Sequence, residues 1–231
     1  MRILFFVLVV FAAAVFGQTP VVNQSFAEAT RRARNLQYES AIEKYQLTLL
    51  QAENEQSSDA FLARIHFNIG ACFYQLKNPA RAAEEFTEAI KLSKRDYQKA
   101  FYALGMARKD LKNWRESEIA FRAALKIKKD DGEAWFDLAM VFLEEKDFDA
   151  AEKAFGKSIE YESVASADAH NNIGVIYALK TNFSSAEIEF ENALTESKGK
   201  SVEARNNLRF CQLYKRNFNQ NLLAELEFSR R

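Results

Sequence analysis

The chain has 231 residues, of which 32 are Lys or Arg and 32 are Asp or Glu, so its formal net charge is zero. A neutral chain lacks the electrostatic attraction that usually indicates nucleic acid or an anionic membrane surface as a partner. Only two prolines and seven glycines occur, which favours an all-helical chain.

The N-terminal stretch reads MRILFFVLVVFAAAVFGQTP, with a positive charge at Arg2 and an apolar run from Ile3 to Phe16. Because this run is shorter than the roughly 20 residues of a membrane-spanning helix, we interpret residues 1–17 as a secretory signal peptide. The alternatives are an uncleaved anchor and a buried helix. Cleavage after Gly17 predicts an exported chain with no stable membrane insertion. The periplasm is the first expectation, and secretion or a secretory-pathway lumen are the others.

Pairs of amphipathic helices are predicted from Val22 to Leu226, beginning with a weaker pair over residues 22–50. The spacing from Ala29 to Gly70 is 41 residues rather than the 34 or 35 found later, which predicts an extended second helix or a loop near residues 51–59. The clearest pair spans residues 132–159, where apolar residues recur at helical spacing on both sides of a polar break. These residues are Trp135, Leu138, Ala139, Phe142, Ala151 and Phe155.

Three rows of residues recur in register with this pair. Small residues recur at spacings of 35, 34 and 35, as Gly70, Gly105, Ala139 and Gly174. Aromatic residues recur as Tyr45, Phe86, Phe121, Phe155 and Phe190. A predicted N-cap precedes each second helix, at Asn78, Asn113, Asp147, Asn182 and Asn217. Small residues in register with aromatic ones predict closely packed helix hairpins.

The arrangement W-x-x-L-A-x-x-F followed by A-x-x-x-F resembles the tetratricopeptide repeat (TPR), with Ala139 where the family usually has Gly and Phe142 where it usually has Tyr. The resemblance covers residues 22–226. It implies an all-α, right-handed superhelical solenoid of helix-turn-helix units over residues 18–231, with about five units and a degenerate C-terminal capping pair. The Pro that often closes a TPR unit is missing throughout.

Side chains that could perform catalysis do not form a recognisable constellation. His66 and His170 take the place of Trp135 in their units, so they are expected to pack on helices rather than to converge on a metal. Cys72 and Cys211 stand in repeats four apart, too distant in a solenoid for a disulfide, which predicts two buried thiols. We therefore expect a protein that is not an enzyme and takes no cofactor.

A second apolar stripe runs along the first helix of each pair, at Phe136, Met140 and Leu143 in the unit of residues 132–159. Trp135, Leu138 and Phe142 are expected to build the hairpin, which leaves this second stripe to contact something else. In TPR proteins the matching positions line a concave groove, and the resemblance carries that role here. The predicted groove residues are Phe67, Tyr74, Lys99, Tyr102, Met106, Lys109, Phe136, Met140, Leu143, Asn171, Val175 and Phe210. The alternative is that these side chains pack between neighbouring first helices.

Charged residues on the same face are sorted along the chain. Basic residues come first, at Arg34, Arg64, Lys99 and Lys109, and acidic ones follow, at Glu133, Glu144, Asp168 and Glu203. Such a field would orient a bound peptide more than it would tighten binding. The clamp that some TPR proteins use for a terminal carboxylate is not expected, because its positions hold Phe67 and Ala71, or Phe26 and Thr30.

The sequence therefore predicts a non-enzymatic protein-protein interaction scaffold of the cell envelope, which binds an apolar or aromatic peptide or helix in its groove. Self-association as a structural or assembly protein is an alternative. A third possibility is an accessory recognition subunit of an envelope enzyme complex.

Overall fold

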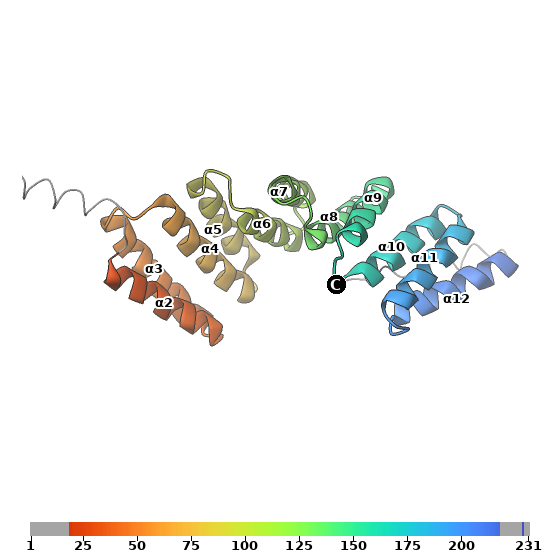
Figure 1. The fold of residues 1–231 in the computed structure, drawn as a ribbon, viewed down its shortest axis with the longest axis horizontal. Helices are drawn as coiled ribbons and strands as arrows, with labels where there is room; N and C mark the ends of the chain where they lie inside the picture. Colours follow the sequence, from red (N-terminus) through yellow and green to blue (C-terminus); the bar gives the residue numbers. More distant parts are fainter. Residues whose placement is uncertain (1–18, 218–227, 229–231) are drawn as a thin grey trace, which may run out of the picture. The chain divides into compact units, whose positions relative to one another are not determined.

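A computed structural model describes residues 19–217 and residue 228, and within these residues all regular structure is helical (Figure 1). The signal peptide and the capping helix expected after Asn217 lie outside the described residues. None of the described helices is long and apolar enough to cross a membrane. The helices are α2 (Pro20–Arg34), α3 (Tyr38–Asn54), α4 (Asp59–Gln75), α5 (Pro79–Leu92), α6 (Gln98–Asp110), α7 (Trp114–Ile127), α8 (Gly132–Glu144), α9 (Phe148–Glu160), α10 (Ser166–Leu179), α11 (Phe183–Glu196) and α12 (Val202–Asn217).

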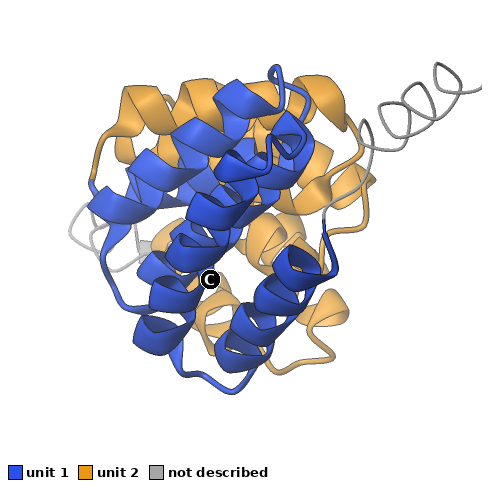
Figure 2. Cartoon of the chain, turned by 90° about the vertical axis from the view of Figure 1, so that its left-hand side faces the viewer, with its two compact units in different colours: residues 1–111 blue, residues 112–231 orange. Residues whose placement is uncertain are grey.

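The chain divides into two compact units, residues 1–111 and 112–231 (Figure 2). In the first unit each of the helices α2 to α6 contacts the next one along the chain, and α4 also contacts both α2 and α6. The helices α7 to α12 of the second unit pack in the same sequential way, with an additional contact between α10 and α12. Each unit is thus an array of antiparallel helices in which contacts are made between neighbours.

The helix boundaries confirm most of the predicted caps. A side-chain oxygen accepts a hydrogen bond from the backbone N–H three residues later at Asn78 (3.2 Å), Asp147 (3.0 Å) and Asn182 (3.3 Å). Asn113 occupies the N-cap position of α7 without such a bond. Asn217 is the last residue of α12, and the helix that it was expected to cap lies outside the described residues, so this N-cap stays a prediction.

The turns between paired helices use a left-handed residue where other chains use glycine or proline. Lys77, Lys146 and Thr181, each directly before an N-cap, have φ values of 57°, 60° and 60°. The following backbone N–H then bonds to a carbonyl five residues earlier, as in the 2.9 Å bond from Asn78 N to Phe73 O. This arrangement satisfies carbonyl groups at the end of the first helix of each pair.

The aromatic row is buried in every pair, with Tyr45, Phe86, Phe121, Phe155 and Phe190 all 2% exposed or less. A Cβ atom built on Gly70 would lie 2.8 Å from the ring of Phe86, and one built on Gly174 would lie 2.6 Å from the ring of Phe190. The small residues therefore allow the close helix packing that the sequence predicts.

The first helix pair has an extended second helix, one of the two alternatives that the spacing predicts. The helix α3 has 17 residues, whereas α5 has 14, and its added turn buries Ala52. Gln37 stands at its N-cap without a side-chain hydrogen bond. Buried hydroxyl groups of Ser25 and Thr48, 2.8 Å apart, join α2 to α3. A long helix rather than a loop thus accounts for the irregular repeat spacing.

Candidate protein-binding surfaces

Three of the predicted groove residues are buried and present no surface to a partner. Phe136 is fully buried, and its ring lies 5.3 Å from the ring of Phe155 in an edge-to-face arrangement. Val175, 1% exposed, belongs to a buried cluster of α10 to α12 against which Phe228 packs. Asn171 is fully buried as well. The prediction that these side chains are free to contact a partner is wrong, because they pack within the array instead.

Asn171 belongs to a set of buried asparagines that the sequence pattern does not reveal. Its Oδ1 atom accepts a 2.9 Å hydrogen bond from Nδ2 of Asn207, which joins α10 to α12. Its Nδ2 atom lies 3.4 Å from Oδ1 of Asn172. All three asparagines are fully buried. Buried amides need such partners, so their role is to hold neighbouring first helices together.

The other predicted groove residues keep some exposed surface. Phe67, Tyr74, Tyr102 and Met106 are half-buried on α4 and α6. The ring of Phe67 lies 5.6 Å from that of Phe86 and 5.1 Å from that of Tyr97. Lys99 is exposed, and the remaining candidates Lys109, Met140, Leu143 and Phe210 are half-buried. A binding role for these nine residues stays a prediction.

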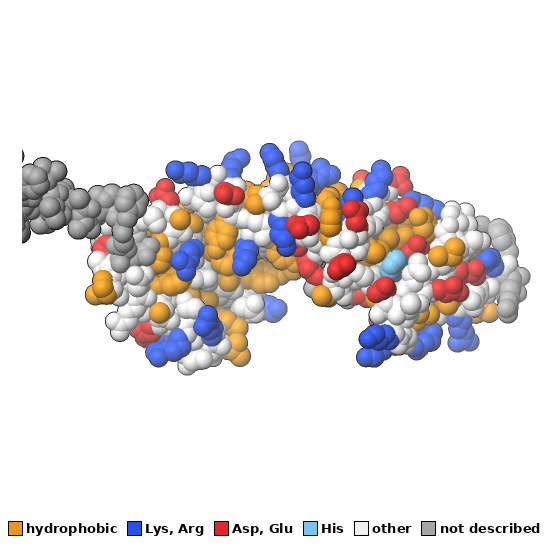
Figure 3. All heavy atoms as spheres, viewed as in Figure 1, with side chains coloured by type: hydrophobic (Ala, Val, Ile, Leu, Met, Phe, Trp, Pro, Cys, Tyr) orange, Lys and Arg blue, Asp and Glu red, His pale blue; other side chains and the backbone are white. Residues whose placement is uncertain are grey.

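We refer to the residues Phe67, Tyr74, Tyr102 and Met106 as the α4–α6 surface. Arg64, one turn before Phe67, is exposed and its guanidinium lies 5.1 Å from the ring centre of Phe26. Hydrophobic side chains gather over α4 to α6 with Lys and Arg side chains among them on the face drawn in Figure 3.

Glu133, expected at the acidic end of a groove, lies in the second compact unit. Its carboxylate accepts hydrogen bonds from Ser163 and Val164 in the loop before α10.

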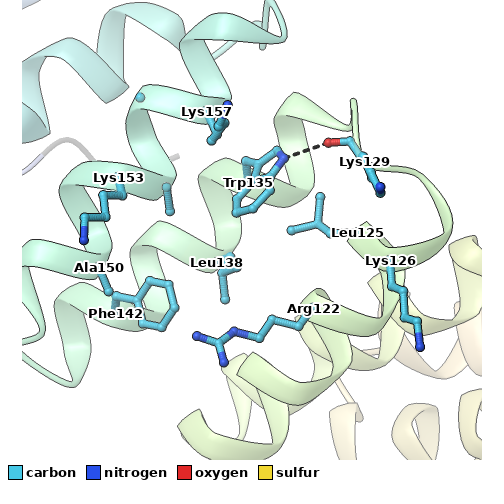
Figure 4. Close-up of a pocket in the computed structure, with 12 residues that line it drawn as sticks. Arg122, Leu125, Lys126, Lys129, Trp135, Leu138, Phe142, Ala150, Lys153 and Lys157 are labelled. Carbon is cyan, nitrogen blue, oxygen red and sulfur yellow. Dashed lines mark hydrogen bonds between the residues drawn. The ribbon is translucent and has the colours of Figure 1, made fainter.

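A second candidate surface is a pocket of about 780 Å³ between α7, α8 and α9 (Figure 4). Trp135, Leu138 and Phe142 of α8 line this pocket; Leu138 and Phe142 are buried, whereas Trp135 is half-buried. Phe136, the neighbour of Trp135, takes the place against Phe155 inside the hairpin. Successive residues of a helix point about 100° apart, so Phe136 faces the hairpin interior while Trp135 faces the pocket.

Basic side chains surround the apolar floor of this pocket. The floor consists of Leu125, Trp135, Leu138, Phe142, Ala150 and Ala154. The rim carries Arg122, Lys126, Lys129, Lys153 and Lys157. The indole N–H of Trp135 donates a 2.8 Å hydrogen bond to the carbonyl of Lys129, and the Arg122 guanidinium lies 5.6 Å from the ring centre of Phe142. We call this site the basic-rimmed pocket.

The histidines that replace Trp135 in other units form polar contacts at the corresponding place. Nδ1 of His66 lies 2.7 Å from Oε2 of Glu85, and Nδ1 of His170 lies 2.7 Å from Oε2 of Glu189. In both pairs the glutamate follows the histidine by 19 residues. The residue 19 positions after Trp135 is Ala154, so an apolar pair replaces a polar bridge there. The histidines thus join two helices within a unit.

Neither cysteine has the surroundings of a reactive thiol. Cys72 and Cys211 are free and buried, as the sequence predicts, and burial raises the pKa of each to about 11. The thiol of Cys211 donates to the carbonyl of Phe183 at 3.4 Å. No group of three or more His, Cys, Asp or Glu side chains that could hold a metal ion occurs among residues 19–217.

Two family models, both described as tetratricopeptide repeat, match this chain. One matches residues 63–96, and the other matches residues 102–163 and, with overlap, residues 144–201. These ranges cover most of the helix pairs from α4 to α11. The chain contains tetratricopeptide repeats. The TPR units give it an all-α fold of the kind used in protein interactions. Among the curated proteins, none matches this chain significantly.

Solved TPR structures share the fold at low sequence identity. The crystal structure of MamA has a TM-score of 0.68 at 20% identity, over 74% of this chain and 95% of that one. YrrB, described as a TPR protein with an unusual peptide-binding site, has a TM-score of 0.64 at 22% identity, over 76% and 86%. BtubC from P. vanneervenii has a TM-score of 0.67 at 17% identity, over 77% and 80%. These similarities concern the fold.

Proposed function

We propose that this TPR protein is a non-enzymatic scaffold of the cell envelope that holds an apolar or aromatic peptide or helix on its first helices. The observation that carries the proposal is the α4–α6 surface, where aromatic and Met side chains keep exposed area. Large aromatic residues and adaptable Met residues contribute strongly to protein recognition. YrrB, a solved TPR protein of similar fold, is described as having a peptide-binding site, which supports this class of ligand.

Burial restricts the proposed contact to part of the chain. Phe136 and Val175, the equivalents of half-buried residues on α4 and α6, are buried in the second unit. The side-chain oxygen of Asn171 accepts a hydrogen bond from Asn207. A peptide on the first helices therefore contacts α4 and α6 chiefly, and the basic residues Arg64 and Lys99 on these helices favour a partner with acidic flanks.

Site-specific photocrosslinking tests this assignment. A benzoylphenylalanine is placed at Tyr74 or Tyr102, and at exposed Glu84 on α5 as the matched control. We expect Tyr74 and Tyr102 to crosslink to the same small set of envelope proteins and Glu84 not to do so, with the crosslinked peptides identified by mass spectrometry. A Tyr102→Glu variant with unchanged helicity should lose that partner. Equal crosslinking from all three positions would contradict the proposal.

The envelope location rests on the predicted signal peptide of residues 1–17. We expect N-terminal sequencing of the exported chain to begin at Gln18, and a chain that retains Met1 inside the cell would overturn the location. Self-association is distinguished by light scattering: a mass of one chain at all concentrations rules out the assembly alternative. An accessory role beside an enzyme would be recognised from the identity of the crosslinked partner.

A further inference from the structure

We propose that the basic-rimmed pocket between α7, α8 and α9 is a second binding site, which takes an acidic peptide segment through a bulky apolar side chain. The site is separate from the α4–α6 surface, since every residue that lines it belongs to α7, α8, α9 or the loop from α7 to α8. The proposal goes beyond the function proposed above and does not depend on it.

The floor of the pocket fits an apolar side chain. Leu125, Leu138 and Phe142 are 6% exposed or less, so they form a fixed base, while the indole of Trp135 is partly open to solvent. Figure 4 shows Trp135, Leu125 and Leu138 converging on the same space. A volume of about 780 Å³ exceeds what one aromatic side chain fills, which leaves space for the flanking backbone. Clefts of this kind anchor bulky apolar residues in protein interfaces.

The positive charges of the rim favour a negatively charged ligand. Of its five cations, Arg122 pairs with Glu118 at 2.9 Å and Lys157 pairs with Glu160 at 2.6 Å. Lys126, Lys129 and Lys153 take part in no salt bridge within the part of the chain that the structure describes. In Figure 3 hydrophobic side chains are visible between the Lys and Arg side chains over α7 and α9. Three available ammonium groups around an apolar floor are complementary to acidic residues flanking an apolar anchor.

The corresponding position one helix pair later in the chain, between α9 and α10, is closed by polar bridges. There Tyr177 donates a 3.0 Å hydrogen bond to Glu152, and Nζ of Lys180 lies 2.9 Å from Glu152 and 2.7 Å from Asp149. The chain places Glu145 at the position equivalent to Lys180, and Glu118 at that equivalent to Glu152. Two like charges cannot form this bridge. Burial, with Glu118 and Asp147 nearby, raises the pKa of Glu145.

At the centre of the pocket, the contact between a histidine and a glutamate is also missing, which leaves this place open. A His and a Glu in contact close this place in the units of α4–α5 and α10–α11. Trp135 and Ala154 leave it open and apolar. Two departures therefore meet at this site, one from the His–Glu contact of the α4–α5 and α10–α11 pairs and one from the polar bridge between α9 and α10. This combination is an argument for binding rather than for packing, because the packed alternative is present elsewhere in the same chain.

Fluorescence anisotropy with three labelled twelve-residue peptides tests the proposal. The first peptide carries a central Trp-Leu pair flanked by Glu residues, the second has Ala-Ala at its centre, and the third has Gln in place of every Glu. We expect the purified chain to bind the first peptide at least tenfold more tightly than either of the others. Its affinity should fall as NaCl is raised from about 50 to about 300 mM, because exposed charges are screened.

Two double variants locate the site. Trp135→His with Ala154→Glu installs the polar pair found in two other units, so it should fold and bind the first peptide at least tenfold more weakly. Lys126→Glu with Lys153→Glu should have a similar effect. Lys91→Glu with Lys200→Glu, a matched charge reversal at exposed positions elsewhere, should change the affinity less than twofold. Circular dichroism verifies the fold of each variant.

Several results would overturn the proposal. Failure of the unaltered chain to bind the acidic Trp-Leu peptide would do so, as would equal affinity for the Gln peptide. Unchanged affinity in both pocket variants would place the peptide elsewhere, and loss of binding in Tyr102→Glu alone would assign it to the α4–α6 surface. If the pocket variants instead abolished a dimer of the chain, the occupant would be a second copy rather than a peptide partner.

Discussion

The small residue opposite each buried aromatic ring sets how closely two paired helices approach. Gly174 lies against Phe190 and Gly70 against Phe86, each too close for an added Cβ atom without movement of the ring. Because both rings are fully or nearly fully buried, they have little space to move. Gly156 is also helical, but a Cβ atom added there would meet no other atom within 4 Å and would face open space. Helical glycines of the same chain thus have opposite physical roles.

Replacing Gly174 or Gly156 by alanine should change stability in opposite directions. Gly174→Ala is expected to lower the free energy of unfolding by about 1–3 kcal/mol, because the methyl group overpacks the hairpin. Gly156→Ala should raise it by about 0.5–1 kcal/mol, since alanine loses less backbone entropy in a helix. Urea unfolding followed by circular dichroism measures both changes. A destabilisation of the same size in both variants would show that ring contact is not the cause.

Among the structural elements, the turn between the two helices of a pair has the same construction in several pairs. It combines a left-handed residue, an N-cap and a backbone bond that spans five residues. The caps were predictable because Asn and Asp side chains satisfy helix N–H groups locally. The left-handed residues were not, since lysine and threonine carry no sequence signal for a positive φ. Thr181 is the least favourable of them because its side chain is β-branched.

Thr181→Gly should therefore stabilise the α10–α11 pair. Glycine adopts a φ of 60° without the steric cost that threonine has there, so we expect a gain of about 1 kcal/mol in the free energy of unfolding. Glu191→Gly, an exposed substitution inside α11, is the control and should cost about 1 kcal/mol. Thermal and urea unfolding measure the two effects. A loss of stability in Thr181→Gly would mean that the turn does not hold this residue in the left-handed region.

At the scale of the whole molecule, stability is distributed over helices that contact mainly their neighbours. In such repeat proteins the free energy of folding is approximately a sum of local terms. The two compact units contain different helices, α2 to α6 and α7 to α12, so a defect in one array should act first on that array. Phe136, fully buried against Phe155, is the position at which to introduce such a defect.

Phe136→Glu should unfold part of the second unit rather than only abolish binding. It places an unpaired carboxylate in the hairpin and removes a buried ring, which should cost at least about 3 kcal/mol. Hydrogen exchange measured by mass spectrometry should accelerate in α8 and α9 and less in α2 to α4. Tyr102→Glu, at a half-buried position, should leave the exchange of α8 and α9 unchanged. Normal exchange in Phe136→Glu would contradict the burial of this residue.

The repeat length, the helix pairs, the buried aromatic row and most of the caps could be predicted from the sequence. These features depend on residue volume, on helical periodicity and on hydrogen bonds within a few residues, all of which are local properties. The two buried thiols follow from the register of the repeats, whereas the spacing left both an extended helix and a loop open for residues 51–59.

The tertiary structure decided which of two adjacent aromatic side chains is buried in the hairpin. Trp135 and Phe136 are adjacent and both aromatic, so periodicity alone does not say which one enters the hairpin. The answer depends on Phe155 on one side and on α7 and α9 on the other. The pocket likewise requires Trp135 of α8, Ala154 and two lysines of α9, and the lysines of α7 and the following loop to meet in space. Burial is a property of neighbouring helices, and for that reason only the folded array separates the residues that pack from those that remain available for binding.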